Sequence, residues 1–280
     1  MGELDGKVVV VTGGASGIGK GCSERFVAEG AQVVIADVNA EDGEAVAGAL
    51  GANAAFKATD VSDAASVDEL VDFAVERFGG LHCMFNNAGI SGARTEHILD
   101  HDFSDFEKVM AINVLGVAHG IRSAARHMKD HGGGSIINTT SIGGMQYGKG
   151  NYSYAMSKAS VIMLSNSAAI DLGEHGIRIN CIAPANIESP ILGNMLGQGL
   201  SEEDKAAMMV EVREFLLSRQ PIRRQGTTDD IAQAAMFLAS DRSGYSTGQV
   251  ICVDGGMLTG NPSPSNELQE IVGRYRGAAH

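Results

Sequence analysis

Short apolar runs alternate with longer amphipathic segments along most of the chain. Val8–Val11 is an unbroken run of four valines, which is typical of a strand buried on both faces of a parallel sheet. Helical spacing of apolar residues follows in segments such as 66–78. This alternation predicts an α/β fold with one doubly wound, seven-stranded parallel sheet flanked by helices. The expected strands are 7–12, 32–37, 54–58, 81–85, 135–141, 177–183 and 249–253.

A glycine-rich turn follows the first predicted strand. Gly13, Gly17 and Gly19 are spaced G-x-x-x-G-x-G, and a helix is expected from there to Glu29. Glycines let the backbone turn tightly and approach a pyrophosphate at the positive end of a helix. Together with Ser16 and Ile18 inside the turn, they predict a dinucleotide-binding loop. A flexible surface turn is the alternative, which the flanking strand and helix disfavour.

The second predicted strand ends in Asp37, about 20 residues after the glycine turn, where a carboxylate can bind a ribose 2′-hydroxyl. A 2′-phosphate would be repelled there, and Ala36, Val38 and Asn39 provide no compensating positive charge. The cofactor predicted is therefore NAD rather than NADP. The alternative is a helix cap, since Asp37 and Asn39 both precede the helix that starts near residue 41.

A second group of chemically active side chains begins at Ser141, where another predicted strand ends. Tyr154 and Lys158 lie four residues apart on the following helix, and are therefore neighbours on one face. A phenol has a pKa near ~10, and a nearby ammonium lowers it. Ser141 could donate a hydrogen bond to an oxygen also held by Tyr154. This arrangement suits proton transfer at a hydroxyl or carbonyl oxygen. Taken alone, the pair fits an ordinary amphipathic helix as well.

Two further polar features need an interpretation. Asn113 lies within an apolar run of a long predicted helix, 103–131, and a buried amide needs partners. It could simply be a satisfied core residue. His97 and His101 are four residues apart, but without a third ligand nearby they are better interpreted as a surface pair, so no metal site is predicted.

Composition narrows the function classes. Apolar residues make up 44% and charged residues 20%, as in an ordinary soluble globular protein. The formal net charge of −13 argues against a nucleic-acid or anionic-membrane surface. No apolar run is long enough to span a bilayer, and the N-terminus is too polar for a signal peptide. The four cysteines are scattered without a C-x-x-C, as expected for reduced thiols in a cytoplasmic protein.

Six motifs occur in a characteristic order. They are Thr12-Gly13-x-x-x-Gly17-x-Gly19, Asp60-Val61, Asn86-Asn87-Ala88-Gly89, Asn113, Ser141 and Tyr154-x-x-x-Lys158. In order and spacing they resemble the short-chain dehydrogenase/reductase family over residues 5–258. The resemblance implies one Rossmann domain over 1–259, with an extension at 260–280.

The resemblance also implies roles. Tyr154 would be the acid/base, Ser141 would orient the substrate oxygen, and Lys158 would bind the nicotinamide ribose and lower the Tyr154 pKa. The Asn113 backbone would hold a relay water. Further implied cofactor contacts are Val38, Asp60, Val61, Asn87, Ala88, Gly89, Pro184, Ile187 and Ser189, and further substrate contacts are Gln146 and Met195.

Departures from the family pattern affect the expected substrate. Pro184-Ala185 stands where Pro-Gly is usual, and Ser189 where threonine is commoner. The stretch 98–117 resembles NAD-dependent dehydrogenases of terpenoid, steroid or lignan alcohols. The expected reaction is the interconversion of a secondary alcohol and a ketone on a small, hydrophobic, cyclic substrate. The alternatives are a 3-oxoacyl-[acyl-carrier-protein] reductase, which usually needs NADPH and a basic patch, and a catalytically silent nucleotide-binding sensor.

Three expectations concern regions outside the motifs. Residues 191–220, rich in methionine and glycine, are expected to form a mobile substrate lid. The resemblance implies a homotetramer that pairs the helices near 103–131 and 152–174 across one two-fold axis. In the extension, Leu268, Ile271, Val272 and Tyr275 form one helical stripe, expected to dock across the interface or over the lid. A frayed terminus is the alternative.

Overall fold

The computed structural model describes residues 2–146, 150–187, 201–218 and 220–260. Seven parallel strands form one sheet in the order β3-β2-β1-β4-β5-β6-β7, which confirms the predicted doubly wound fold. The strands are β1 Val8–Thr12, β2 Gln32–Asp37, β3 Ala54–Ala58, β4 Cys83–Asn86, β5 Gly134–Thr139, β6 Ile177–Pro184 and β7 Val250–Val253. The α-helices described are α1 Gly17–Ala28, α2 Ala40–Leu50, α3 Ala64–Phe78, α4 Phe106–Met110, α5 Gly116–Met128, α6 Tyr152–Leu172, α8 Glu202–Ser218 and α9 Thr228–Ala239.

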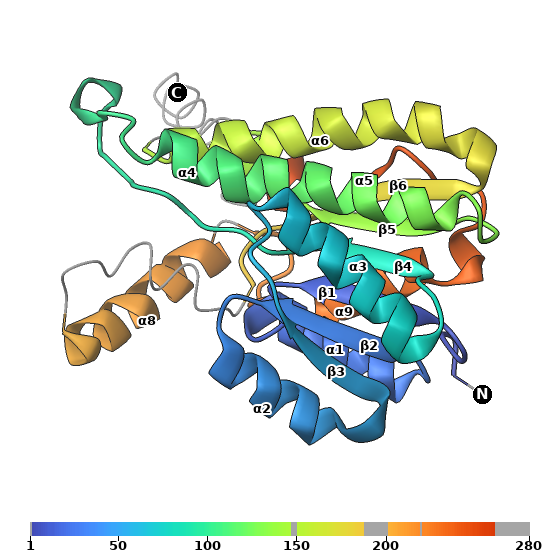
Figure 1. The fold of residues 1–280 in the computed structure, drawn as a ribbon. Helices are drawn as coiled ribbons and strands as arrows, with labels where there is room; N and C mark the ends of the chain where they lie inside the picture. The colour runs from blue at the N-terminus through green and yellow to red at the C-terminus, as the bar shows by residue number, and fades with distance from the viewer. Residues whose placement is uncertain (1, 147–149, 188–200, 219, 261–280) are drawn as a thin grey trace, which may run out of the picture.

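Helices cover both faces of the sheet, as Figure 1 shows: α1, α2 and α9 lie on one side, and α3, α5 and α6 on the other. Alternate residues of β1 therefore enter different cores. Val9 and Val11 pack with Phe26 of α1, whereas Val8 and Val10 pack in the cluster beneath α3 and α5. Burial on both faces explains why this strand is a continuous apolar run rather than an alternating one.

The order of the strands determines where a ligand-binding crevice can form. The chain goes from β1 outward to β2 and β3, and then returns to β4 on the other side of β1. Loops after β1 and β4 therefore diverge at the carboxyl edge of the sheet, which creates the crevice where ligands bind in open α/β sheets. The glycine turn follows β1, and Asn87 follows β4.

Two predicted elements differ in detail. The long helix expected at 103–131 consists of α4, a π-helical turn at Ala111–Leu115, and α5, so it is interrupted around Asn113. The strand expected to end at Ser141 ends at Thr139. Ser141 instead begins a short 3-10 turn, where its hydroxyl accepts a hydrogen bond from the Gly143 amide at 3.0 Å. Both differences occur at residues with candidate functional roles.

Some sequence expectations lie outside the described residues, namely Ser189, Met195 and the extension beyond Gly260. Of the expected lid, the structure describes α8 and Gln220. One side of α8 carries Met208, Met209, Val212 and Leu216, all partly exposed. Figure 1 shows α8 beside the molecule, apart from the helices that cover the sheet. The lid itself stays a prediction.

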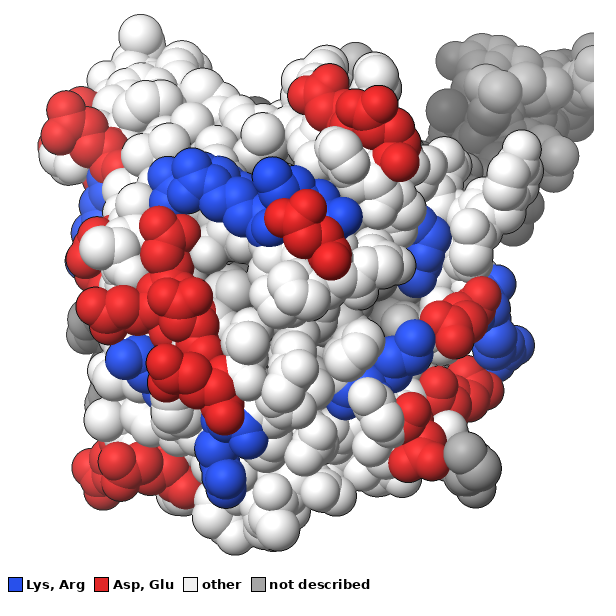
Figure 2. Space-filling model, turned by 45° about the vertical axis from the view of Figure 1, so that its right-hand side comes forward, with Lys and Arg blue, Asp and Glu red and all other residues white. Residues whose placement is uncertain are grey.

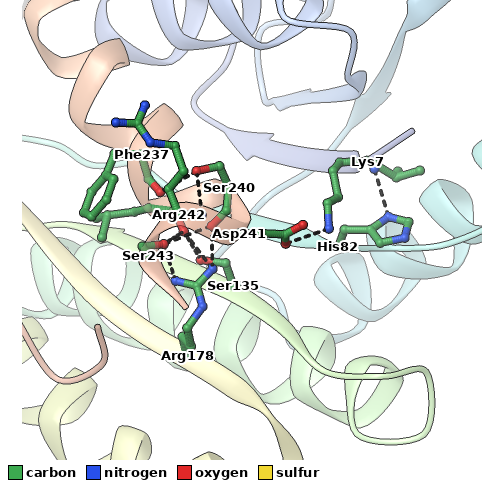
Figure 3. A network of polar contacts seen from close by, with 11 residues as sticks. Lys7, His82, Ser135, Arg178, Phe237, Ser240, Asp241, Arg242 and Ser243 are labelled. Carbon is green, nitrogen blue, oxygen red and sulfur yellow. Dashed lines mark hydrogen bonds and ion pairs between the residues drawn. The ribbon is translucent and has the colours of Figure 1, made fainter. Parts of the chain in front are cut away.

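The opposite, amino-terminal edge of the sheet is held by Arg178 of β6 (Figure 3). Its guanidinium donates to the Ser243 hydroxyl at 2.6 Å and to the carbonyl oxygens of Leu238 and Ser240 at 3.1 and 3.2 Å. These carbonyls end helix α9, where the macrodipole favours a cation. Arg178 therefore fastens the last helix to the sheet.

Arg178→Met should lower the free energy of unfolding by about 2–4 kcal/mol, because three charge-assisted hydrogen bonds to partly buried acceptors are lost. Arg242→Met is the matched control. Arg242 pairs with Glu3 at 2.8 Å on the surface, with 64% of its side chain exposed, so its loss should cost less than about 1 kcal/mol. Urea unfolding measures both variants. Equal losses in the free energy of unfolding would show that the hydrogen bonds of Arg178 stabilise the protein no more than a surface ion pair does.

Candidate active site

A cavity of about 500 Å³ opens at the carboxyl edge of the sheet, a size typical of a small-molecule or cofactor site. It extends from Asp37 at the end of β2 to Tyr154 on α6. Most residues singled out from the sequence line it: Gly13, Ser16, Gly17, Ile18, Asp37, Val38, Asp60, Val61, Asn87, Ala88, Gly89, Ser141, Tyr154, Lys158, Pro184 and Ile187. The fold thus brings into one cavity residues that are up to 174 positions apart, from Gly13 to Ile187.

Hydrogen bonds from the residues that follow β4 hold the glycine turn in place. The Thr12 hydroxyl accepts from the backbone amides of Asn87 and Ala88 at 2.9 and 3.1 Å, and the Asn87 side chain donates to the Thr12 carbonyl at 3.1 Å. Gly13 has φ +64°, and a Cβ there would lie 2.9 Å from the Cα of Ala88. Asn87 therefore supports the turn with its amide, in addition to lining the cavity.

Gly19 has a packing role beside the glycine turn. It is absent from the described lining of the cavity. A Cβ on Gly19 would instead collide with the carbonyl oxygen of Gly13. Its lack of a side chain lets helix α1 pack directly under the turn, and a contact of Gly19 with the cofactor stays a prediction.

The start of α1 is suited to an anion. Within the described structure, the Ser16 side chain makes no capping hydrogen bond, and the first turn of α1 contains no acidic residue. The first backbone N–H groups of the helix are thus available at its positive end, beside a cavity lined by Gly13 and Gly17. These features fit the diphosphate of a dinucleotide.

Asp37 is held in place at the other side of this turn. Its carboxylate accepts from the amide of Ala15 at 3.1 Å and from that of Asn39 at 3.0 Å. The cap of α2 is Asn39, whose side chain accepts from the Asp42 amide, so of the two residues considered for this cap it is Asn39 and not Asp37 that forms it. Among the described cavity-lining residues, the only cationic side chain is Lys158, which lies with Ser141 and Tyr154.

Tyr154 and Lys158 meet on α6 as the four-residue spacing predicted. The Lys158 ammonium lies 5.6 Å from the centre of the Tyr154 ring and donates to the Thr139 carbonyl at 2.9 Å. Lys158 is only 4% exposed, and this burial lowers its pKa to about 8. The lysine is still mostly charged at neutral pH, and it has a carbonyl partner at the end of β5.

The pKa of Tyr154 differs from the expectation. Burial raises the pKa of this phenol above its usual value, and a hydrogen bond with Ser141 opposes the rise. The expected lowering by Lys158 is therefore not found, because desolvation dominates and the ammonium is bonded to Thr139. The phenol keeps its proton at neutral pH, which suits donation to a carbonyl oxygen.

Asn113 is fully buried in the π-helical turn. Its side-chain oxygen accepts from the Ile90 amide at 2.8 Å, and its amide donates to the Ile90 carbonyl at 2.9 Å and to the Ser157 hydroxyl at 3.0 Å. The side chain is thus a satisfied core amide that joins the loop after β4 to α6. A π-helical turn at such a position is common at functional sites. The relay water stays a prediction.

The sequence interpretation missed part of the cavity and misplaced one residue. Gln146 is exposed and is absent from the described lining, so its predicted substrate contact is not supported. The residues missed are Ala36, Thr59, Ile90, Ser91, Ile112, Thr139 and Thr140, whereas Ala185, singled out as a departure from the family pattern, does line the cavity. Thr59, Thr139 and Thr140 end or directly follow a strand, and their position at the carboxyl end of a parallel strand was the signal that could have identified them.

Comparison with known proteins identifies the family. Residues 13–258 match the family model described as "Enoyl-(Acyl carrier protein) reductase". The chain is 39% identical over 264 residues to momilactone A synthase of Oryza sativa subsp. japonica, a match that covers 93% of each protein. The chain belongs to the short-chain dehydrogenase/reductase family. The resemblance noted from six motifs is thereby confirmed.

Solved structures of this family share the fold. Levodione reductase superposes with a TM-score of 0.82 at 34% identity, covering 90% of this chain and 97% of that one. The 3-ketoacyl-(acyl-carrier-protein) reductase from Brucella melitensis, complexed with NADH, superposes with a TM-score of 0.80 at 32% identity, covering 91% and 99%. The chain is thus an oxidoreductase of this family that acts on CH–OH groups with a nicotinamide cofactor.

Two other site types receive no support from the described residues. No group of three or more His, Cys, Asp or Glu side chains among them is placed to hold a metal ion. Their helices include none with the length and apolar character needed to cross a bilayer.

Proposed function

We propose that this short-chain dehydrogenase/reductase uses NAD to interconvert a secondary alcohol and a ketone on a small, hydrophobic, cyclic substrate. The observation that carries the proposal is the end of the cavity, where the Tyr154 phenol is hydrogen-bonded with Ser141 and lies beside the buried Lys158 ammonium. Acid, hydrogen-bond donor and cation are the groups that proton transfer at a carbonyl oxygen requires.

Each side chain has a defined task. The nicotinamide cofactor, when bound, supplies or accepts the hydride. Tyr154 gives its proton to the ketone oxygen in reduction and receives it back in oxidation. Ser141 donates a hydrogen bond to the same oxygen. As the proton leaves Tyr154, the nearby ammonium of Lys158, itself only 4% exposed, stabilises the phenolate that remains.

The cavity and the surface support the substrate class. Ile90, Ile112, Ala185 and Ile187 add apolar surface to the lining. The similarity to levodione reductase supports a small ketone or alcohol. The 3-oxoacyl-[acyl-carrier-protein] reductase alternative is less supported, because an acidic carrier would be repelled by a chain of net charge −13. On the face drawn in Figure 2, basic side chains form short clusters bordered by acidic ones, without a broad basic area. A silent sensor would have no need of an intact proton-transfer group.

Tyr154→Phe should reduce turnover by roughly 100-fold or more while leaving NADH binding nearly unchanged, because it removes only the acid/base group. A panel of cyclic secondary alcohols and ketones, followed by NADH absorbance, identifies the substrate class and measures the loss. Tyr152→Phe is the matched control, since Tyr152 packs edge-on against His101 instead. Near-normal turnover in the Tyr154→Phe protein would remove Tyr154 from the mechanism.

Wild-type protein should bind NADH roughly 100-fold more tightly than NADPH, because Asp37 can bond ribose hydroxyls but repels a phosphate. Changing Asp37→Ser together with Val38→Arg should bring the two affinities within about tenfold of each other by the same reasoning. Isothermal titration calorimetry measures both. Glu41→Ser, which removes an exposed negative charge nearby, should leave the preference unchanged. Equal affinities in the wild type would reject the NAD assignment.

A homotetramer is supported by the outward face of α6. Met156, Ala159, Met163, Ser167 and Ile170 follow one another along this helix, all exposed and all uncharged. Ile170 is 82% exposed, which is costly for an isolated chain in water. Light scattering at micromolar concentration should give the mass of four chains, and Ile170→Glu should yield smaller species. A wild-type monomer would contradict the assembly.

The proposed location is the cytoplasm. All four cysteines lie in described regions and are free, three of them buried. Free thiols are typical of proteins in reducing compartments. Cell fractionation tests this assignment, and recovery of the protein with secreted material would reject it.

A further inference from the structure

Asp105, the residue that precedes α4, connects two parts of the active site. One carboxylate oxygen accepts from the Ala93 amide at 2.7 Å, and the other accepts from the Ser153 hydroxyl at 2.8 Å. Ala93 belongs to the loop after β4, in which Ile90 and Ser91 line the cavity. Ser153 is fully buried in the first turn of α6 and directly precedes Tyr154. A single carboxylate thus bonds the cavity wall and the catalytic helix.

The surroundings hold this carboxylate in position. Only 16% of the Asp105 side chain is exposed, and the His101 ring, 1% exposed, lies behind it with Nε2 4.0 Å from the carboxylate. Gly92 has φ +71°, and a Cβ there would collide with the Asp105 carboxylate, so the loop backbone lies directly against it. Hydrogen bonds from a backbone amide to a partly buried carboxylate are stronger than neutral ones. The contact is therefore a defined clamp rather than a surface interaction.

The same loop is held at its other end by Asn113. That side chain bonds both backbone groups of Ile90 and also the hydroxyl of Ser157 on α6. Ser153 and Ser157 are four residues apart and lie on one face of the helix, while Tyr154 and Lys158 occupy the adjoining face. The loop is thus attached to α6 at two successive turns, and Asp105 provides the attachment at Ser153, which directly precedes Tyr154.

We propose that Asp105 is a positioning residue: through Ser153 and Ala93 it sets the Tyr154 phenol against the wall that the loop after β4 contributes to the substrate cavity. The inference rests on the proposed acid/base role of Tyr154. Misplacement of a reacting group by about 1 Å can reduce turnover by ~100-fold without removing any catalytic atom. The residue therefore acts on the chemical step through geometry, without itself contacting the substrate.

The experiment compares three variants with a matched control. Asp105→Ala removes both hydrogen bonds. Asp105→Asn can keep both, with its oxygen on the Ala93 amide and its NH₂ donating to the Ser153 hydroxyl. Ser153→Ala removes only the hydrogen bond between Asp105 and helix α6. Asp102→Asn is the control, because Asp102 lies three residues upstream and, in the described structure, bonds the amide and hydroxyl of Ser104 instead.

Two measurements separate positioning from general stability. The first is kcat on the panel alcohol that the wild type oxidises fastest, together with the Kd for NADH. Asp105→Ala should lower kcat by roughly 10- to 100-fold with Kd changed by less than about twofold. Asp105→Asn should restore kcat to within about threefold of the wild type, and Asp102→Asn should not change it. Ser153→Ala should fall between these limits.

The second measurement is hydrogen exchange of the protein without cofactor, in peptides that cover 89–95 and 152–158. Asp105→Ala should accelerate exchange in both, Ser153→Ala only in the second, and Asp102→Asn in neither. Wild-type kcat and exchange in either Asp105→Ala or Ser153→Ala would overturn the proposal, as would Asp105→Asn losing as much activity as the alanine variant. If Asp105→Ala does not fold, the results for Ser153→Ala and Asp105→Asn still decide whether Asp105 is a positioning residue.

Tyr154→Phe, measured in the same assay, separates this inference from the proposed function. Full activity after that substitution would reject the proposed role of Tyr154, and with it a catalytic purpose for the clamp. An inactive Tyr154→Phe protein combined with a normal Asp105→Ala protein would reject the clamp alone.

Discussion

The active site depends on one buried cation. Burying an ammonium is costly unless it finds strong partners, and Lys158 is only 4% exposed. Its partner is the carbonyl oxygen of Thr139, the last residue of β5, at 2.9 Å. The Thr140 hydroxyl in turn donates to the Lys158 carbonyl at 2.7 Å. Lys158 can stay charged beside Tyr154 only if α6 lies directly against the carboxyl end of β5, so the position of this helix is a requirement of the chemistry.

A buried chain of hydrogen bonds keeps α6 in that position. The Asn86 amide on β4 donates to Asn138 on β5 at 2.8 Å, and the Asn138 amide donates to the Ser165 hydroxyl on α6 at 2.8 Å. Such a network is favourable only when every member is satisfied, so it specifies one register of helix on sheet. Gly144 adds to the constraint, because a Cβ there would lie 2.6 Å from the Lys158 carbonyl carbon. Polar bonds and close packing therefore define the same arrangement.

Local pattern was sufficient to predict the fold, the glycine turn and the side chains of the proton-transfer group, whereas most of the other cavity residues came from the family resemblance. Val8–Val11 identified a strand buried on both faces, and the spacing from Tyr154 to Lys158 placed two side chains on one helical face. These features depend on residues close in sequence. The raised pKa of Tyr154 does not, because it reflects desolvation of the phenol by segments that are distant in the sequence. The same limit applies to Asp105, whose partners Ala93 and Ser153 lie 12 and 48 residues away.

Helix α6 uses two adjoining faces, one for proton transfer and one for attachment to the loop after β4. One face bears Tyr154 and Lys158, and the other bonds the loop after β4 through Asp105 and Asn113. A change in the wall that this loop supplies is consequently transmitted to the acid/base group. The opposite wall is attached differently. The Ala185 amide donates to the Val253 carbonyl of β7, and Ile187 pairs with Gly226, so neither of these backbone contacts involves α6. The shape of the cavity at Ala185 and Ile187 is therefore set by backbone contacts separate from those that position α6.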